Sequence, residues 1–343
     1  MSRRGLTVGM VGCGRIGAKR ADALAPQDVL VGCCDVDAGA AEELARRQGC
    51  EAYATIEALL PREPELVVIA AVHDQLARLT ELALASGAHV LVEKPAAVSV
   101  AQVDRLIECQ RDAGRLVKVG FNHRFHPAIA RAVEEVHSGR HGDLMHVHAR
   151  YGHGGRPGYD REWRVEPSRS GGGELVDQGM HLLDLSNWIA GPLPLHSVLL
   201  RTQFWDVEVE DNAALLLGEA GSRTGPWTML HVSWSEWKNL FSLEIYCLTA
   251  KIQVDGLTGS YGPQRLRIYQ MGPELGPPAL EEFHYPHVDE SWRAEWEHFA
   301  EAVLAADGRP LLGDLQSARD AWEQVETAYA ASVYGGSAAE VQL

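Results

Sequence analysis

The chain has 343 residues, 46% hydrophobic and 23% charged, which is an ordinary globular composition and long enough for two domains. Its formal net charge of −16 argues against nucleic acid as a partner, because phosphate binding needs a basic face. No apolar run has the length of a membrane span, and the six cysteines lack the paired spacing of a zinc site. We therefore expect a cytoplasmic protein without a secretory leader, bound metal or membrane contact.

The first 120 residues alternate between short apolar runs and helical patterns. Apolar runs without polar alternation are typical of a parallel sheet that is covered on both faces. The expected strands are 6–11, 29–34, 66–70, 89–92 and 116–120. The expected helices are 16–24, 38–47, 75–86 and 100–113. This order predicts an α/β domain over residues 1–122 with a doubly wound Rossmann sheet.

A glycine-rich turn joins the first expected strand to the first expected helix. It has the G-x-G-x-x-G pattern of dinucleotide-binding loops: Gly12, Cys13, Gly14, Arg15, Ile16 and Gly17. Gly12 would permit the tight turn, Gly14 the approach of a pyrophosphate, and Gly17 close packing of helix on sheet.

An acidic residue, Asp35, ends the second expected strand about 20 residues after the loop, where a carboxylate can bind the adenosine ribose. Asp37 follows, and no Arg or Lys is present nearby to bind a ribose 2′-phosphate. The predicted cofactor is therefore NAD rather than NADP. The alternative is that Asp35 only caps the next helix.

The strand 89–92 leads into Glu93-Lys94-Pro95. Residues at the carboxyl ends of parallel strands line the binding crevice, and a partly desolvated lysine there can move a proton or polarise a carbonyl. Pro95 would hold the chain in a fixed bend, for which a cis bond is one option. The alternative is that Lys94 is an ordinary surface lysine.

Three consecutive glycines, Gly171 to Gly173, precede a segment of helical period in the second half of the chain. Residues four apart share one face of a helix, which would place Asp177 beside His181 and Asp184 on the next turn. A carboxylate fixes the tautomer of a neighbouring imidazole, and such a pair can transfer protons. The alternative is that Asp177 caps the helix and His181 is an ordinary half-buried histidine.

In this order, the glycine loop, the Glu-Lys-Pro sequence and the Asp-x-x-x-His sequence resemble the Gfo/Idh/MocA family of NAD(P)-dependent sugar and inositol dehydrogenases. The resemblance implies catalytic roles for Lys94, Asp177 and His181. It also implies a second domain, residues 123–343, built on a large, open and mostly antiparallel sheet. The segment 120–125 looks like the family's crossover between domains.

One position departs from the family. After the strand 66–70 the family usually reads A-T-P, whereas this chain has Ala71, Val72 and His73, so the nicotinamide contact there is open. His73 could contact the cofactor or only cap the next helix. The predicted cofactor-binding residues are Gly12, Gly14, Arg15, Ile16, Gly17, Asp35, Ala71, His73, Glu93 and Lys94.

The second half has strand-like segments at 145–151, 213–218, 227–234, 241–248 and 251–254, followed by helical patterns at 291–305 and 314–334. In the family, the other face of the second sheet often forms the dimer or tetramer interface, so the resemblance implies a homodimer or homotetramer. Trp227, Trp234 and Trp237 agree with an interface, although tryptophan is more commonly buried in a core.

Five arginines gather just before the three glycines: Arg150, Arg156, Arg161, Arg164 and Arg169. Arginine binds phosphate and carboxylate in a bidentate way, and the neighbouring aromatic rings can stack on sugars, which favours an anionic or nucleotide-linked sugar. The alternative is that the arginines pair with nearby acids, which leaves a neutral sugar or inositol open. The predicted substrate-binding residues are Asn122, Arg124, Tyr151, Arg156, Trp163, Arg164, Asp177 and His181.

The sequence thus predicts an NAD-dependent dehydrogenase that oxidises a secondary hydroxyl group of a sugar or cyclitol. His181, aided by Asp177, would take the hydroxyl proton, Lys94 would stabilise the developing alkoxide, and Asp184 would orient the helix or a sugar hydroxyl. Two rivals stay open: a lyase or epimerase that oxidises the sugar transiently, and a non-catalytic dinucleotide-binding regulator. A zinc site using His181 and Asp184 is the weakest alternative.

Overall fold

The computed structural model describes residues 3–274, 276–285, 288–305 and 310–332, and the chain divides into two compact units. The first unit comprises residues 1–122 and 290–319, and the second comprises 123–289 and 320–343. The predicted domains, 1–122 and 123–343, differ from these units in the segment 290–319, which belongs to the first unit. Among the described residues, no helix is long and apolar enough to span a membrane.

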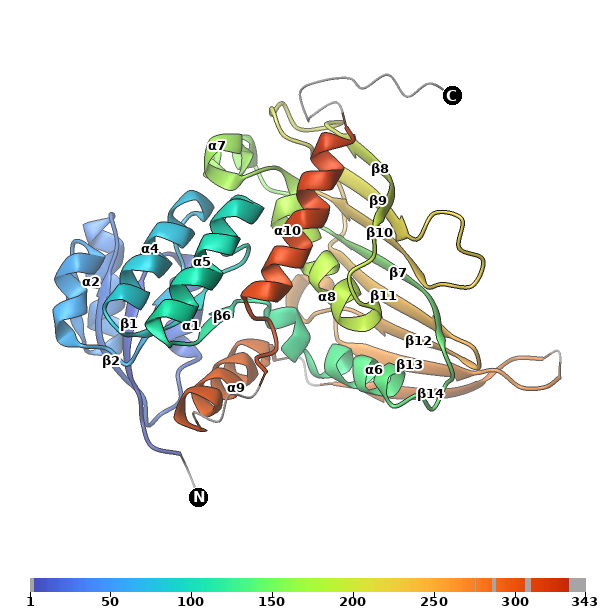
Figure 1. The fold of residues 1–343 in the computed structure, drawn as a ribbon, viewed down its shortest axis with the longest axis horizontal. Coiled ribbons are helices and arrows are strands. Elements are labelled where there is room, and N and C mark those ends of the chain that lie inside the picture. Colours follow the sequence, from blue (N-terminus) through green and yellow to red (C-terminus); the bar gives the residue numbers. More distant parts are fainter. Residues whose placement is uncertain (1–2, 275, 286–287, 306–309, 333–343) are drawn as a thin grey trace. The chain divides into compact units, whose positions relative to one another are not determined.

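The first unit is built on a parallel sheet with the strand order β3-β2-β1-β4-β5-β6, so the predicted Rossmann sheet is confirmed. Its strands are β1 (Thr7–Val11), β2 (Val29–Cys34), β3 (Glu51–Tyr53), β4 (Leu66–Ile69), β5 (His89–Val92) and β6 (Val117–Val119). Helices alternate with them along the chain (Figure 1): α1 (Arg15–Asp22), α2 (Ala38–Gln48), α3 (Ile56–Leu59), α4 (His73–Ala85) and α5 (Val100–Ala113).

Burial explains which of these strands the sequence predicted. All four residues of β4 are fully buried, which produces the continuous apolar run. The edge strand β3 has three residues and none is buried, so it has no apolar signature and was missed. Helix α9 (Ser291–Ala305) packs Trp296 and Phe299 into the core of the first unit, beside Leu6. These apolar contacts account for the return of the segment 290–319 to this unit.

The second unit is built on an eight-stranded sheet with the order β14-β13-β12-β11-β7-β10-β9-β8, and only β10 and β7 pair in parallel. The mostly antiparallel open sheet is thus confirmed. Its strands are β7 (Leu144–Gly152), β8 (Leu195–Arg201), β9 (Asn212–Gly218), β10 (Trp227–Ser233), β11 (Leu240–Cys247), β12 (Ala250–Asp255), β13 (Arg265–Gln270) and β14 (Ala279–His284). Of these, β8, β13 and β14 were not predicted, and β8 and β14 are largely exposed.

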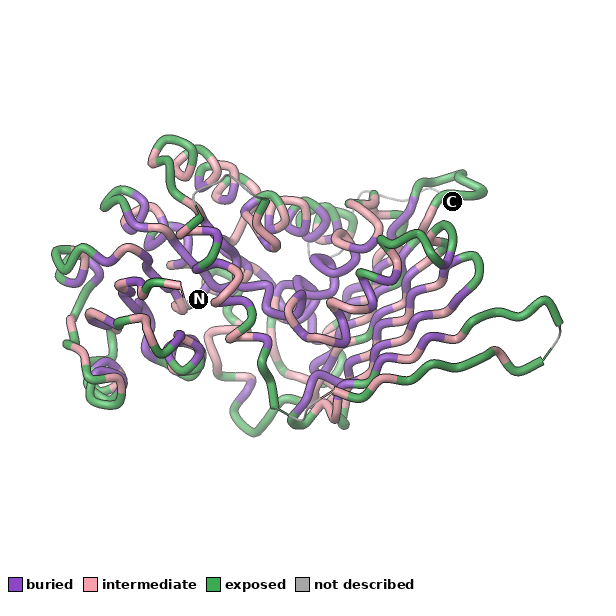
Figure 2. The backbone as a smooth tube through the Cα atoms, turned by 90° about the horizontal axis from the view of Figure 1, so that it is seen from below, coloured by how far each residue is buried: buried purple, intermediate pink, exposed green. Residues whose placement is uncertain are grey.

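Burial alternates along the inner strands of this sheet, and Figure 2 shows buried positions regularly separated by less buried ones. The buried face packs against two helices, α6 (Pro127–His137) and α8 (Met180–Ala190), as Figure 1 shows. A helix with one apolar stripe covers a sheet with one apolar face, which leaves the opposite face of the sheet open. The last helix, α10 (Leu315–Ala330), ends four residues before the predicted limit, and residues 333–334 of that prediction lie outside the described residues.

Candidate active site

The glycine loop between β1 and α1 has the geometry that a dinucleotide-binding loop requires. Gly12 has a φ of +90°, and a Cβ there would lie 2.6 Å from the carbonyl carbon of Ala70. A Cβ on Gly17 would overlap the carbonyl group of Gly12. Gly14 differs, because a Cβ there would meet nothing within 4 Å. As the N-cap of α1, Gly14 makes no side-chain cap, so the N–H groups of the first turn can face a bound anion.

The carboxylate of Asp35 braces this loop. One oxygen accepts a hydrogen bond from the backbone N–H of Cys13 at 2.6 Å, and the other accepts from the N–H of Asp37 at 2.9 Å. The N-cap of α2 is Asp37, whose side chain accepts from the N–H groups of Gly39 and Ala40. Asp35 therefore stands beside the glycine loop and is not the capping residue. Its oxygens retain further lone pairs for ribose hydroxyls.

The turn after β5 contains a cis peptide bond between Lys94 and Pro95, the option that the sequence left open. Lys94 is only partly exposed, which does not fit an ordinary surface lysine. At the end of the neighbouring strand β4, Ala71 is partly exposed and His73 is buried. His73 is the first residue of α4, and the N-cap is Val72, so the capping role considered for His73 does not hold.

Glu93 belongs to a buried ionic cluster in the first unit that is centred on Arg20. Arg20 donates to Glu93 at 2.6 Å and also to Glu295 of α9, and the ammonium group of Lys118 lies 3.9 Å from Glu295. Burial raises the pKa of Glu93, while the guanidinium of Arg20 opposes this shift. A Cβ on Gly120 would lie 2.5 Å from Nη2 of Arg20, so the cluster also needs a glycine there. The carboxylate of Glu93 thus fixes the turn that carries Lys94.

Two predicted substrate-binding residues have structural partners instead. The amide of Asn122 donates to the hydroxyl of Ser291 at 3.0 Å, within the first unit. In the second unit, Arg124 binds Asp184 in a bidentate way, at 2.8 and 2.6 Å, and both side chains are buried. Asp184 therefore anchors α8, which fits the orienting role expected of it. Among the described residues no group of three or more potential metal ligands is present.

The helical segment after the three glycines begins as a π-helix, η5 (Leu175–Gly179), and continues as α8. The structure gives the three glycines before this segment a packing role. The backbone N–H of Gly173 donates to the hydroxyl of Tyr329, and that hydroxyl donates to Glu210 at 2.9 Å. Glu210 also accepts from the backbone N–H of Leu175 at 2.9 Å. A Cβ on Gly172 or Gly173 would overlap these partners.

Asp177 and His181 lie on this segment with distinct surroundings. The carboxylate of Asp177 accepts from the hydroxyl of Tyr159 at 3.3 Å and lies 3.7 Å from the guanidinium of Arg164. The buried ring of His181 stacks on the ring of His123, with centroids 3.8 Å apart and an interplanar angle of 24°. The predicted Tyr151 lies edge-on to His181, with centroids 6.3 Å apart. Burial raises the pKa of Tyr151 well above its ordinary value, so its hydroxyl stays protonated.

The sequence missed several residues around this segment. His123 occupies a variable position of the crossover motif, and nothing in the sequence linked it to His181. Glu210 and Tyr329 are 37 and 156 residues away from Gly173 in sequence, so only the fold brings them together. Tyr159 was noted only as an aromatic neighbour of the arginines, although its hydroxyl binds Asp177.

Each of the five arginines near the site has a carboxylate within 4 Å. Trp163, the remaining predicted contact, is partly exposed and lies under the guanidinium of Arg164, 4.7 Å from its ring centroid. The pairs are Arg150–Glu236, Arg156–Glu162, Arg161–Asp160, Arg164–Asp177 and Arg169–Glu166. Arg164 also donates to Glu162 at 3.0 Å and so shares that carboxylate with Arg156. The pairing alternative therefore describes this segment.

The fold and these features define a dinucleotide-binding oxidoreductase of two domains. Residues 6–121 match the family model described as "Oxidoreductase family, NAD-binding Rossmann fold", and residues 129–253 match "GFO/IDH/MocA C-terminal domain". The two matches cover more than two thirds of the chain, which belongs to the Gfo/Idh/MocA family.

Particular relatives act on varied sugars. Inositol 2-dehydrogenase from Rhizobium meliloti (strain 1021) is 26% identical over 86% of this chain and 88% of its own length. D-glucoside 3-dehydrogenase from Escherichia coli (strain K12) is 30% identical over 47% of this chain and 46% of its own length. A putative UDP-kanosamine synthase oxidoreductase subunit from Amycolatopsis mediterranei (strain S699) is 29% identical over 50% of this chain. The match spans 47% of the length of this last relative. It also spans about half the length of several other curated relatives.

Solved structures show the same fold across the whole chain. A levoglucosan dehydrogenase in complex with NADH and levoglucosan aligns with a TM-score of 0.82 and 19% identity, covering 96% of this chain and 98% of that one. An aldose-aldose oxidoreductase from Caulobacter crescentus, complexed with glycerol, has a TM-score of 0.82 and 22% identity, covering 97% and 98%.

Proposed function

We propose that this chain is an NAD-dependent dehydrogenase that oxidises a secondary hydroxyl group of a sugar or cyclitol. The observation that carries the proposal is that one chain combines an uncapped, open glycine loop braced by Asp35 with a buried histidine, His181, on a helix anchored by Asp184. The first supplies a dinucleotide site and the second supplies a base. Membership of the Gfo/Idh/MocA family supports the combination.

The first unit fits NAD better than NADP. The open space at Gly14 and the uncapped first turn of α1 suit a pyrophosphate, and Asp35 suits the ribose hydroxyls. Asp35 and Asp37 would both repel a 2′-phosphate. When bound, NAD supplies the acceptor for the hydride. The protein's own part is to hold the ribose through Asp35 and to present Lys94 from the turn that Glu93 fixes.

Proton transfer is assigned to the second unit, with Lys94 assisting. His181 takes the proton of the substrate hydroxyl, and the negative charge of Asp177 favours the imidazolium that results. Arg164 and the hydroxyl of Tyr159 stabilise the ionised form of Asp177. Lys94 would stabilise the developing alkoxide, a role that the family resemblance implies. Because each of the five arginines already has a carboxylate within 4 Å, we infer a substrate that needs no anionic group.

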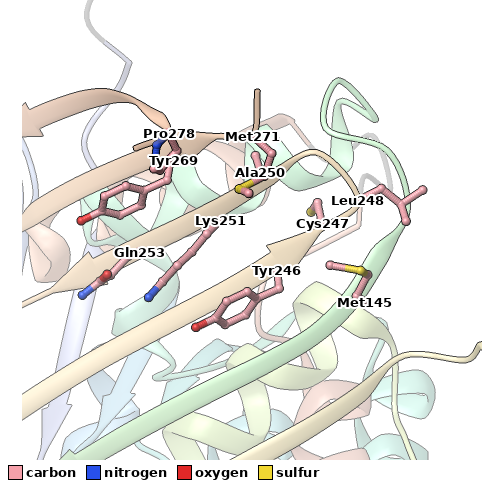
Figure 3. Close-up of a pocket in the computed structure, with 10 residues that line it drawn as sticks. All are labelled: Met145, Tyr246, Cys247, Leu248, Ala250, Lys251, Gln253, Tyr269, Met271 and Pro278. Carbon is pink, nitrogen blue, oxygen red and sulfur yellow. The ribbon is translucent and has the colours of Figure 1, made fainter. Parts of the chain in front are cut away.

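We also propose that the open face of the second sheet forms the interface of a homodimer or homotetramer. Trp227, Met229 and Leu199 are exposed on this sheet, whereas Trp234 is fully buried. An open hollow of about 500 Å³ lies on the sheet and is lined by aromatic, apolar and basic side chains (Figure 3). Exposed apolar groups in such number are typical of interaction surfaces. Analytical ultracentrifugation of the purified protein tests this proposal, and a monomer at micromolar concentration would contradict it.

The proposal predicts a large loss of turnover when the base is removed. His181→Ala should lower kcat by roughly 10²–10⁴-fold, the usual contribution of a general acid–base group, with little change in NAD affinity. The measurement is NADH absorbance under saturating substrate, with the exposed His137→Ala as the matched control. Turnover of His181→Ala near that of the wild type at neutral pH would refute the assignment.

The substrate class is tested with purified protein and excess NAD or NADP against inositols, free sugars, glycosides, uronic acids, sugar phosphates and UDP-sugars. Reduction of NAD with a neutral sugar or cyclitol is the expected result. Turnover only with an anionic sugar would contradict the charge argument while keeping the dehydrogenase. Consumption of a sugar without net NADH would instead favour the lyase or epimerase.

A further inference from the structure

The candidate base, His181, lies face to face with a second histidine, His123. The rings of His123 and His181 stack with centroids 3.8 Å apart and an interplanar angle of 24°. His123 and His181 are 5% and 7% exposed, so the stack is shielded from water. His123 belongs to the short turn η2 (Asn122–Phe125), and His181 to the first turn of α8. A ring contact between two buried imidazoles differs from the carboxylate–imidazole pair that the sequence suggested.

Neighbouring interactions hold this stack in place. Arg124, the residue after His123, binds Asp184 of α8 in a bidentate way. This ion pair fixes η2 against α8 three residues beyond His181. The ring of His123 also meets the rings of Tyr151, His126 and Phe241, at centroid distances of 5.2, 5.4 and 6.0 Å. His123 therefore has little freedom to turn away from His181, because buried side chains packed on several sides keep one rotamer.

Resting on the proposed function, we propose that His123 is a positioning residue for that reaction: its ring fixes the plane of the His181 imidazole, and the first proton bound by the stacked pair lowers the pair's affinity for a second. The base is then presented in one orientation and returns to the neutral form that can accept a proton. No local pattern in the sequence indicated this role, because the contact between His123 and His181 forms only when η2 packs against α8.

Electrostatics explains why the pair should bind its two protons in separate steps. Two imidazolium rings in contact repel each other strongly when water is excluded, so the first proton lowers the affinity for the second. Such a pair titrates in two steps that belong to both residues together. On the other side of His123, burial lowers the pKa of His126 to about 4, so His126 adds no charge above about pH 5.

The two-step titration of the stacked pair also depends on the other titratable groups around His181. Asp177 on η5 favours one proton on the pair, while the charges of Asp184 and Arg124 offset each other. Tyr151 on β7 stays neutral, because burial raises its pKa. Tyr261, on the short turn η6 (Gly259–Tyr261), packs on Tyr151, and burial raises its pKa to about 12. Glu210, which accepts from the backbone N–H of Leu175 at the start of η5, has its pKa raised by burial to about 7. Between about pH 5 and pH 9 the groups expected to change charge here are thus the two stacked histidines and Glu210, and the loss of one inflection in His123→Phe distinguishes them.

The first arm of the test is a titration that needs no substrate. Histidine ring resonances of the full chain, saturated with NAD, are followed by NMR between pH 5 and pH 9, with the His181 signal assigned by its loss in His181→Ala. In the wild type the His181 signal should show two inflections. In His123→Phe, which keeps a flat ring but has no proton to bind, it should show one. A merely structural role for His123 would give the same single inflection in both proteins.

The second arm is kinetic and uses the sugar or cyclitol with the highest turnover in the substrate panel. His123→Ala should lower kcat between about 10-fold and 100-fold, the scale expected when a catalytic group is misplaced, with the KM for NAD unchanged. His123→Phe should recover most of this loss, because the stack is retained. The exposed His137→Ala serves as the control for the removal of a histidine.

The two arms separate this inference from the function on which it rests. A single His181 inflection in the wild type, or a kcat of His123→Ala equal to the wild-type value at every pH, overturns the proposal. Equal losses in His123→Ala and His123→Phe would also overturn the positioning role. If His181→Ala kept wild-type turnover, the proposed function would fail. The titration would still report whether the two rings bind protons as a coupled pair.

Discussion

Two glycine-rich turns precede helices in this molecule, one in each unit, and they use glycine for different reasons. In the first unit, a Cβ on Gly14 would meet nothing within 4 Å, and the residue is exposed. In the second unit, Gly173 is buried, and a Cβ there would lie 2.8 Å from the carboxyl carbon of Glu210. The first turn leaves space for a ligand, whereas the second is filled by the protein's own side chains.

The second turn is fixed by a hydrogen-bonded chain that starts on α10. The hydroxyl of Tyr329 accepts from the N–H of Gly173 and donates to Glu210, and Glu210 accepts from the N–H of Leu175. These bonds define where η5 begins, and so where Asp177 and His181 lie. A glycine-rich turn before a helix therefore indicates that another group comes close to the backbone of the turn. That group can be a ligand or another part of the chain.

The largest expected effect is on the filled turn. In Gly173→Ala the new methyl group overlaps the backbone of Glu210, so the turn must shift, at a cost on the order of 3 kcal/mol or more in the free energy of unfolding. Chemical denaturation followed by circular dichroism measures this loss. Activity should fall with it, because the helix carrying His181 moves. Wild-type stability of Gly173→Ala would mean that the second turn is as open as the first.

The next effect concerns Glu210, which has no counterpart at the first turn. Burial raises the pKa of Glu210 to about 7. The folded state then binds a proton that the unfolded state has released between about pH 4.5 and pH 7, so this group lowers stability as the pH rises through that window. Glu210→Gln, which keeps an acceptor for Tyr329, should remove this loss. Between pH 5 and pH 8 its stability should gain roughly 2 to 3 kcal/mol relative to the wild type.

The measurement for Glu210→Gln is urea denaturation at the two pH values. The exposed Glu219→Gln is the matched control, and its stability relative to the wild type should not depend on pH. A difference between Glu210→Gln and the wild type that stays constant with pH would show that Glu210 is ionised throughout. The second turn would then be held by a buried charge and not by a neutral acid.

The Rossmann sheet could be predicted from the sequence because its central strands are buried on both faces. Val67 and Val68, like their neighbours in β4, are fully buried, and such strands must be apolar along their length. The short strand β3 and the exposed strand β14 could not be predicted in this way, since neither has a buried residue. For the same reason, the inner strands of the second sheet were visible through alternation and its edges were not.

The candidate site was predictable where its residues are close in the sequence or belong to a motif. The glycine loop with Asp35, the turn with Lys94, and the segment from Asp177 to His181 were all identified from local patterns. The contacts that hold the second-unit part of the site join distant segments of the chain. Tyr329 binds Gly173, and Asp184 binds Arg124. No local pattern encodes such contacts, because they arise only when the elements pack. The arginines differ, because three of their carboxylate partners lie within six residues of them, and pairing with nearby acids was an alternative that the sequence left open.

The smallest expected effect is on the open turn, and it sharpens the comparison most directly. Gly14→Ala adds a methyl group where the chain has no neighbour, so the free energy of unfolding should change by no more than about 0.5–1 kcal/mol. The methyl group does stand where a pyrophosphate would approach the backbone, so NAD affinity should fall about tenfold, or about 1.4 kcal/mol. Isothermal titration calorimetry with NAD measures this loss, and the unfolding transition of the same variant provides the control. Unchanged affinity would indicate that the space at Gly14 is not the dinucleotide site, and the two turns would then differ only in what packs against them.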